Sequence, residues 1–547
     1  MYIWDALYGK VEFDSLVYRC MMSPEVQRLR EVRLCNINSL CITGSSNTNR
    51  FEHSVGTAYL ASVNIESSVQ SHLKLNKKTK GTFILAALLH DVANGPFGHS
   101  YEYIMEKQGF VPEKGLGDVL SFEGSGGNKV AYKFSPIFFG KLKALNNILD
   151  SSQKVEVSRI IAGEHILSKL ISSEIDLDNI DNVFRMAYHM GLQFSKEAPL
   201  RLAQNMYIMG DGTVRFKREA ESYLNEWFET RKRVYKFLLL NPQEFAGKYM
   251  LTEAMDILFE CTLENKARDK DNKPVFIEWY YTDYELMTEL EGLTEVWLAR
   301  KILIFDSIDA NLIREVLECN DELAQKTKLK NYIQSLSLLI QIKDKGKSGN
   351  SNTLQLNNNY KFSVSSEEVI SISDRNMDFE INGSKLYKVV YIRYNPSQIV
   401  ARLMTGDLYD CLLILETNDV SKYPQFLDYS KRVTIEGELE TKIKSEKEFA
   451  RLNVGIHPIL DVNKTERQLR VTFDGENIPS IIGDCSSHKL LIGVFIKNEP
   501  YGLSSGKTPL AKHREKLKKV VFNYFASFFE NGAKTVPLYE EADTYGY

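Results

Sequence analysis

The sequence lacks several features that would assign it to a common class of protein. Its seven cysteines include no C-x-x-C pair, and no apolar run approaches the ~20 residues that a membrane-spanning helix needs. The opening residues, MYIWDALYGKVEFDSL, have neither the basic start nor the apolar stretch of a secretory signal. We therefore expect a cytoplasmic protein with reduced thiols and no contact with a membrane, without a disulfide framework or a cysteine-built zinc site.

A strong excess of charge of one sign is also missing. The 547 residues are 43% hydrophobic and 26% charged, with a net charge of −4. This is the balance of a globular protein, and it argues against a general attraction to nucleic acid. The basic run from Lys512 to Lys519 leaves a local contact with a nucleotide or nucleic acid open, although such runs are more often solvated helix faces.

The chain is too long for one ordinary core, so we expect two or three domains. Residues 1–340 are predicted to be mostly helical. Apolar residues recur at helical spacing in three segments: Thr82 to Val92, Val155 to Leu170 and Leu290 to Phe305. Two β-prone runs within Asn205 to Lys217 surround Gly210-Asp211-Gly212, which predicts a hairpin.

The residue composition changes after this helical part. Lys343 to Asn359 is polar and rich in glycine, serine and asparagine, which predicts a flexible loop or linker. Strands and a late helix are then predicted over 385–394, 411–416, 490–496 and 514–529. We predict a mainly α domain over residues 1–340, a linker over 341–380 and a C-terminal α+β domain over 381–547. Asp378 to Tyr394 and Gln468 to Phe473 are predicted either as contact surface or, more commonly, as core strands.

Four polar clusters in the first two hundred residues are suited to metal chemistry: Arg50-Phe51-Glu52-His53, His90-Asp91, Asn94 to Glu102, and Asp176 to Asp181. Imidazole and carboxylate ligands together suit Fe, Mn, Zn or Ni. Such a metal lowers the pKa of water and offsets the charge of a phosphoryl group, which suits hydrolysis. Neighbouring residues of a regular helix point ~100° apart, so His90 and Asp91 can face one ion only where a helix ends. The Gly95-Pro96 break supports a helix end there.

Each cluster also has an ordinary structural interpretation. A His-Asp pair occurs by chance in many chains, His53 could be a hydrogen-bonded core residue, and Asp178 could lie on a solvated face or cap a helix. The order of the clusters along the chain is more informative than any one of them.

In that order, the clusters resemble those of the histidine–aspartate (HD) domain deoxynucleoside triphosphate triphosphohydrolases. Four segments carry the resemblance: Leu7 to Phe13, Asn49 to Gly56, Leu89 to His99, and Asp176 to Gly191, with Gln27 to Arg30 between the first two. The resemblance covers roughly residues 1–300 and implies hydrolysis of a nucleotide at a divalent metal ion (Fe, Mn, Zn, Ni or Mg).

The resemblance also implies roles for individual residues. The metal ligands would be His53, His90, Asp91 and Asp178. His99 would position or activate the attacking water, and Glu102, where the family usually has aspartate, would orient its ring. Arg50 and Arg231 would contact phosphate. His165 would protonate the leaving group or, equally, be an ordinary helix-surface histidine.

Several positions depart from the family pattern. At these positions the sequence has a different residue from the one that the family uses in or near the site, to contact the sugar or the phosphates among other roles. They are Leu34, Asn94, Asn179, Asn182, Met186, Leu239 and Leu240. A site that loses hydrogen-bonding groups loses the discrimination they provided. The metal site is thus expected to be intact, whereas specificity for a deoxynucleotide is open.

Three hypotheses follow. The first is a triphosphohydrolase that releases nucleoside and triphosphate, and the second keeps the metal chemistry but acts on another nucleotide or a phosphodiester. The third is a nucleotide sensor or scaffold with weak catalysis. The resemblance further implies a homo-oligomer, allosteric control by a nucleotide effector, and a role in nucleotide pools or antiviral defence.

Overall fold

A computed structural model of the 547-residue chain describes most of its first 262 residues and much of its last 150. The described residues are 1–34, 48–92, 94–98, 121–123, 129–131, 143–262, 301–305, 353–355, 361–364, 369–373, 378–382, 385–389, 399–400, 402–403, 406–450, 452–476, 478–483, 485–500 and 509–537. The chain divides into two compact units. The first comprises residues 1–256, 276–289 and 400–547, and the second comprises 257–275 and 290–399.

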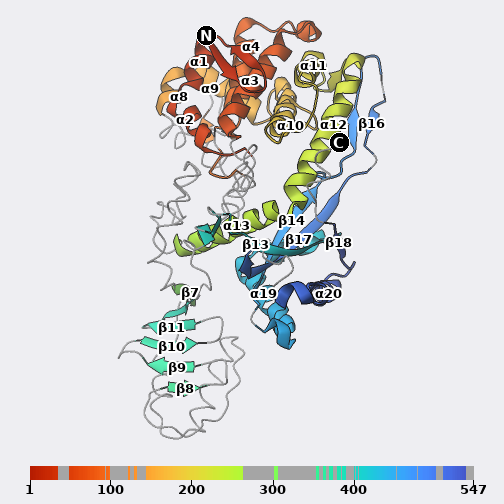
Figure 1. The fold of residues 1–547 in the computed structure, drawn as a ribbon. Coiled ribbons are helices and arrows are strands. Elements are labelled where there is room, and N and C mark those ends of the chain that lie inside the picture. The colour runs from red at the N-terminus through yellow and green to blue at the C-terminus, as the bar shows by residue number, and fades with distance from the viewer. Residues whose placement is uncertain are drawn as a thin grey trace. The chain divides into compact units, whose positions relative to one another are not determined.

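The N-terminal half of the first unit is a group of helices, shown in red to green in Figure 1. Its main helices are α3 (Arg50–Glu66), α4 (Lys77–Leu89), α9 (Ser151–Ile161), α10 (Leu177–His189), α11 (Ala198–Asn205), α12 (Glu221–Leu240) and α13 (Pro242–Thr262). Helix α3 is central, because it packs against α4, α10 and α11. Most residues of α3 are buried, including Phe51, His53, Val55 and Ala58.

Shorter elements surround these helices: the hairpin β1 (Tyr2–Asp5) and β2 (Gly9–Glu12), α1 (Ser15–Met21), α2 (Pro24–Gln27), η1 (Arg28–Glu31), η3 (Ser68–Leu73), α8 (Lys143–Ile148), η4 (Ile166–Leu170) and η5 (Arg218–Ala220). Strands β3 (Ser121–Glu123) and β4 (Lys129–Ala131) form a separate pair. Side-chain caps define where the site helices begin. Asn49 accepts from the amide of Glu52 at α3, and Asp176 accepts from that of Asn179 at α10.

The C-terminal half of the first unit is built on an antiparallel sheet of order β14-β17-β13-β18. Its strands are β13 (Tyr409–Thr417), β14 (Val454–Val462), β17 (His488–Pro500) and β18 (Lys534–Val536). Helices α18 (Tyr423–Leu427), α19 (Tyr429–Lys444) and α20 (Pro509–Phe528), with η8 (Val420–Lys422) and η9 (Lys447–Phe449), pack around it. The core between sheet and helices is aliphatic and aromatic, as at Leu439, Ile492 and Phe525.

A second hairpin, β15 (Leu469–Val471) and β16 (Ser480–Ile482), joins this half to the helical half. It meets the predicted hairpin of β5 (Met206–Ile208) and β6 (Val214–Phe216). The amide of Phe216 donates to the carbonyl of Thr472 at 3.0 Å, and the amide of Asp474 donates back to Phe216 at 2.8 Å. The two halves therefore share main-chain hydrogen bonds within one unit.

The described part of the second unit is a six-stranded antiparallel sheet of order β7-β12-β11-β10-β9-β8. Its strands are β7 (Lys301–Phe305), β8 (Thr353–Gln355), β9 (Lys361–Val364), β10 (Val369–Ser373), β11 (Asp378–Asn382) and β12 (Lys385–Val389). Strands β8 to β12 follow one another as a meander, and β7 pairs with β12.

The mainly α N-terminal half and the mixed C-terminal part confirm the predicted fold class. A helix over Thr82, the hairpin near Gly210, strands that contain 411–416 and 490–496, and the late helix all occur in the structure. The strand predicted over 385–394 is present over 385–389, and residues 390–394 lie outside the described residues. The prediction of a helix over Leu290 to Phe305 was wrong for residues 301–305, which form β7. After Lys301 the run ILIF is apolar at every position, so its period does not separate a helix from a buried strand.

The predicted domain boundaries at 340 and 380 stay a prediction. Strand β8 lies inside the polar segment predicted to be a loop or linker, and β9 to β11 lie largely within the predicted linker range. The basic run of α20 forms surface ion pairs, since Lys516 contacts Glu446 and Glu448 at 2.7 and 2.6 Å. Among the described helices, none has the length and apolarity needed to cross a membrane.

Candidate metal centre

Three helices bring the predicted quartet together. His53 lies in the first turn of α3, His90 caps the C-terminus of α4 with Asp91 directly after it, and Asp178 lies in the first turn of α10. The Nε2 atom of His53 is 2.8 Å from Oδ1 of Asp178 and 3.9 Å from Oδ2 of Asp91. The Nε2 atom of His90 is 3.7 Å from Oδ1 of Asp178 and 3.6 Å from Oδ1 of Asp91.

Both imidazoles are held by their Nδ1 atoms, which leaves Nε2 facing the cluster. His90 Nδ1 lies 2.7 Å from the carbonyl oxygen of Ala87, which can only accept, so the ring nitrogen donates. His53 Nδ1 lies 2.7 Å from Oδ2 of Asp181. The buried Nε2 of His90 has no hydrogen-bond partner among the described residues. An orphaned imidazole nitrogen beside two carboxylates fits a divalent metal ion, and His53, His90 and Asp91 lie close enough together to hold one.

The electrostatics of the cluster favour a cation. Burial lowers the pKa of His53, but hydrogen bonds to Asp178 and Asp181 outweigh it and raise that pKa to about 10. Burial raises the pKa of Asp178, yet the two histidines hold it well below its ordinary value. These carboxylates therefore attract positive charge, which a divalent metal ion could supply.

A layer of residues behind His53 fixes its position. Asp181 accepts hydrogen bonds from Tyr8 Oη at 2.8 Å and from Arg185 at 2.9 and 3.0 Å. The Arg185 guanidinium also pairs with Asp5 at 3.0 Å. Gly56 lies against this pair, because a Cβ atom built there would be 2.1 Å from Oδ1 of Asp181. None of these residues has a role that the sequence predicted, although Asp178, Asp181 and Arg185 have the spacing of one helix face.

Asp91 is held by two side chains. Arg50 Nη1 lies 2.6 Å from Oδ2 of Asp91, and Asn94 Nδ2 donates to Oδ1 at 2.7 Å. Arg28 in turn donates to the carbonyl of Asn94 at 2.7 Å. Asn94 departs from the family pattern, yet here it orients the metal-facing carboxylate. Arg50 thus lies beside the predicted ligands.

The other predicted site residues lie elsewhere or are not described. His165 caps the short helix η4, with Nδ1 accepting from the amide of Leu167 at 3.2 Å, and burial lowers its pKa. Arg231 donates to the carbonyls of Lys464 and Asn463 at 3.0 and 2.9 Å. His99 and Glu102 lie outside the described residues.

Several departures from the family pattern are buried in apolar surroundings. Leu34 packs with Met186, Leu192, Val234 and Leu238 in one hydrophobic cluster. Asn179 does not face the quartet, because its amide donates to both oxygens of Asp176 at 3.1 Å. Apolar packing thus replaces hydrogen-bonding groups on this side of α10.

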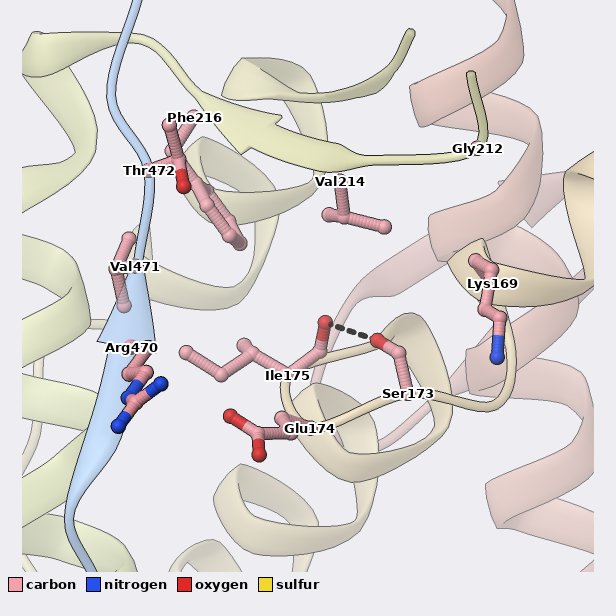
Figure 2. A pocket seen from close by; sticks show the side chains of 10 residues that line it. All are labelled: Lys169, Ser173, Glu174, Ile175, Gly212, Val214, Phe216, Arg470, Val471 and Thr472. Carbon is pink, nitrogen blue, oxygen red and sulfur yellow. Dashed lines mark hydrogen bonds between the residues drawn. The ribbon is translucent and has the colours of Figure 1, made fainter. Parts of the chain in front are cut away.

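A cavity of about 200 Å³ lies beside the loop that leads into α10 (Figure 2). Ser173, on its wall, donates its hydroxyl to the carbonyl of Ile175 at 2.8 Å, and its amide donates to Asp176 at 2.6 Å. The cations at its sides, Lys169 and Arg470, are exposed. The cavity is therefore an open surface hollow behind the N-cap of the helix that carries Asp178.

Comparison with known proteins identifies a domain in the part of the chain that carries the quartet. Residues 50–186 match the HD domain, and the segment contains all four residues of the quartet. The chain therefore carries an HD domain, as its resemblance predicted. HD domains are helical and bind divalent metal ions, and His53, His90 and Asp91 of this chain lie close enough together to hold one.

Curated relatives extend the similarity beyond that domain. An uncharacterised protein of Methanocaldococcus jannaschii is 23% identical over 256 residues, covering 46% of this chain and 49% of the relative. The deoxynucleoside triphosphate triphosphohydrolase SAMHD1 of Danio rerio is 27% identical over 274 residues, covering 46% of this chain and 44% of the relative. The mouse SAMHD1 is 34% identical over 100 residues, which are 18% of this chain and 15% of the relative. The chain thus spans about half the length of the first two of these relatives.

Proposed function

We propose that the chain is a metal-dependent phosphohydrolase that cleaves a deoxynucleoside or nucleoside triphosphate into nucleoside and triphosphate. The observation that carries the proposal is the convergence of His53, His90, Asp91 and Asp178 from three helices, with the Nε2 atoms facing the carboxylates. Relatives named as triphosphohydrolases support the choice of substrate class.

Different residues would bind the metal ion, contact the phosphate and position the attacking water. A divalent metal ion held by the quartet would act as a Lewis acid toward a phosphate oxygen and lower the pKa of water. Arg50, already beside Asp91, would neutralise charge on the phosphate at the reacting phosphorus. His99, oriented by Glu102, would hold the attacking water and take its proton; these two roles rest on the resemblance.

Two further residues have proposed roles away from the quartet. Arg231 would hold phosphate, and His165 would protonate the leaving oxygen. His165 has a pKa lowered by burial, so more of it would be neutral near pH 7 than of a free histidine. It would then act as an acid only where a bound anion raises its pKa again.

A second candidate is the same metal chemistry on another nucleotide or a phosphodiester. The observation in its favour is the apolar environment of Leu34 and Met186, where the family pattern has sugar contacts. A weakly catalytic nucleotide sensor is the third. By resemblance, we also propose a homo-oligomer that responds to a nucleotide effector, which light scattering with and without nucleotides would test.

The test is a product assay with the metal-loaded full-length protein and each dNTP and NTP. Chromatography should resolve nucleoside and triphosphate in equal amounts. Asp178→Ala should lose both bound metal and turnover, whereas Asp211→Ala, in an exposed hairpin turn, should keep both. A fully active Asp178→Ala variant would refute the proposed centre.

A further inference from the structure

The hollow shown in Figure 2 lies where three segments of the first unit meet. Its walls are the loop of residues 173–175, strand β6 of the helical half and strand β15 of the C-terminal half. None of the four residues of the quartet lines it. A molecule bound in the hollow would therefore occupy a site separate from the metal centre.

Hydrogen bonds between the two halves fix the strands that form two of these walls. The amide of Phe216 donates to the carbonyl of Thr472 at 3.0 Å, and the amide of Asp474 donates to the carbonyl of Phe216 at 2.8 Å. Asp474 also accepts from the hydroxyl of Tyr207 at 2.9 Å and pairs with Lys217. The hollow is therefore a built feature of the folded unit, because main-chain and side-chain bonds hold its walls together.

One part of the lining is apolar. Ile175, Phe216 and Val471 are buried, with 5%, 3% and 2% of their surface exposed, and Val214 is half-buried. In Figure 2, Val214 and Phe216 face Ile175 across the hollow. Such a lining favours the apolar part of a ligand, since binding removes apolar surface of both molecules from water.

Two cations line the hollow without a partner of opposite charge. Lys169 of η4 and Arg470 of β15 are exposed, and in Figure 2 they lie on opposite sides of Ile175. Within the described residues, neither side chain forms an ion pair or a hydrogen bond. Glu174 is the one carboxylate among the lining residues, so two positive charges face one negative charge. This balance favours a monoanion over a polyphosphate, whose further charges Glu174 would repel.

The size of the hollow limits the ligand. Its volume of about 200 Å³ corresponds to about seven water molecules, at roughly 30 Å³ each in the liquid. Pockets for drug-sized molecules are larger, at about 300–1,000 Å³. A nucleotide is too large to be enclosed, whereas a carboxylate carried on a single ring or a short branched chain fits.

We propose that this hollow is a binding site for a small organic monoanion, a carboxylate on an apolar ring or short branched chain. The apolar body packs between Ile175 and the pair Val214 and Phe216. The carboxylate accepts two parallel hydrogen bonds from the Arg470 guanidinium, and the Lys169 ammonium adds attraction. The site goes beyond the proposed function and does not depend on it.

Benzoate is a suitable probe, because it combines one carboxylate with one apolar ring. Saturation-transfer NMR on the full-length protein should detect benzoate binding with a Kd on the order of 1 mM. Arg470→Gln should weaken binding about tenfold, as expected for loss of a charged hydrogen bond. Val214→Trp, which fills the hollow, should weaken it at least as much. The exposed Arg201→Gln variant is the matched control and should bind as the wild type does.

Two related probes test the class of ligand. Benzyl alcohol lacks the charge and inorganic phosphate lacks the apolar body, so each should compete with benzoate about tenfold more weakly than unlabelled benzoate does. Phosphate that competes as well as benzoate would make the hollow a site for inorganic anions and overturn the proposal. Benzoate that binds the wild type and both hollow variants equally, or does not bind at millimolar concentration, would overturn it as well.

Two controls separate the hollow from other causes of binding or its loss. Protein dialysed free of metal should still bind benzoate; loss of binding there would place benzoate at the metal centre and contradict the site. A thermal melt tests the fold. Arg470→Gln should melt as the wild type does, because it changes an exposed side chain without a partner among the described residues. If Val214→Trp does not fold, the charge reversal Arg470→Glu replaces it and should abolish benzoate binding.

Discussion

The Nδ1 atom of His53 lies 2.7 Å from Oδ2 of Asp181, one helical turn beyond Asp178, which meets the other side of the same ring. One face of α10 thus supplies both a metal-facing carboxylate and the carboxylate that orients the opposing imidazole. Such a partner fixes the ring's orientation and its tautomer.

Replacing Asp181 should therefore weaken metal binding without removing a ligand. In Asp181→Asn the amide can no longer stabilise a donor at Nδ1 as a carboxylate does, and Arg185 loses one of its charged partners. We expect metal affinity to fall by roughly 10–100-fold. Competition with a chelator measures it, with the exposed Asp211→Asn as control. Unchanged affinity would show that Asp181 only supports the fold.

Two helical glycines should respond oppositely to alanine. Gly56→Ala would place Cβ 2.1 and 2.2 Å from Asp181 and Arg185, so it should destabilise the protein by about 1–3 kcal/mol. Gly81 on α4 has its nearest neighbour at 4.0 Å, so Gly81→Ala should stabilise by about 0.5–1 kcal/mol. Urea unfolding compares them. A harmless Gly56→Ala would mean that the buried pair can shift freely.

Glu244 should make stability fall as pH rises. It is 1% exposed, neither carboxylate oxygen has a hydrogen-bond partner among the described residues, and burial raises its pKa well above 4.5. Between its unfolded and folded pKa the native state holds the extra proton. The contribution of Glu244 to the free energy of unfolding is therefore greatest below about pH 4.5. It declines by up to about 1.4 kcal/mol per pH unit as the pH rises from the unfolded to the folded pKa.

The Glu244→Gln variant should remove that slope and be more stable than the wild type near pH 7. Melting temperatures across pH 5–8, in steps of about half a unit, measure the difference. The exposed Glu229→Gln variant controls for the change of net charge. A wild-type slope that persists in Glu244→Gln would place the responsible group elsewhere.

A buried ion pair joins α13 to α19. Arg432 donates to Asp256, and the two side chains are 2% and 1% exposed. Asp256→Ala would leave a buried guanidinium without this partner, at a cost of about 3–5 kcal/mol. The double variant Asp256→Leu/Arg432→Met should recover most of the loss, whereas the exposed Glu515→Ala should change nothing measurable. A double variant as unstable as Asp256→Ala would argue that other contacts of Arg432 dominate.

Local signals predicted much of the fold, whereas the candidate metal ligands were predicted from the resemblance to a family. The apolar run before His90 predicted the end of α4, and the end of a helix is where adjacent His90 and Asp91 can face one centre. The Gly-Asp-Gly turn predicted the β5–β6 hairpin. The prediction of a helix up to Phe305 failed over residues 301–305, because a short apolar stretch has no period that distinguishes a strand from a helix.

The sequence by itself determined the helices that carry the quartet and the order of its residues, because periodicity and helix caps act over a few neighbouring residues. Only the tertiary structure decided that Asp181, Arg185 and Gly56 support His53, and that Arg231 donates to the carbonyls of Asn463 and Lys464. The latter contact joins residues 232 and 233 positions apart. No local pattern encodes such a distance, since packing of the whole unit sets it.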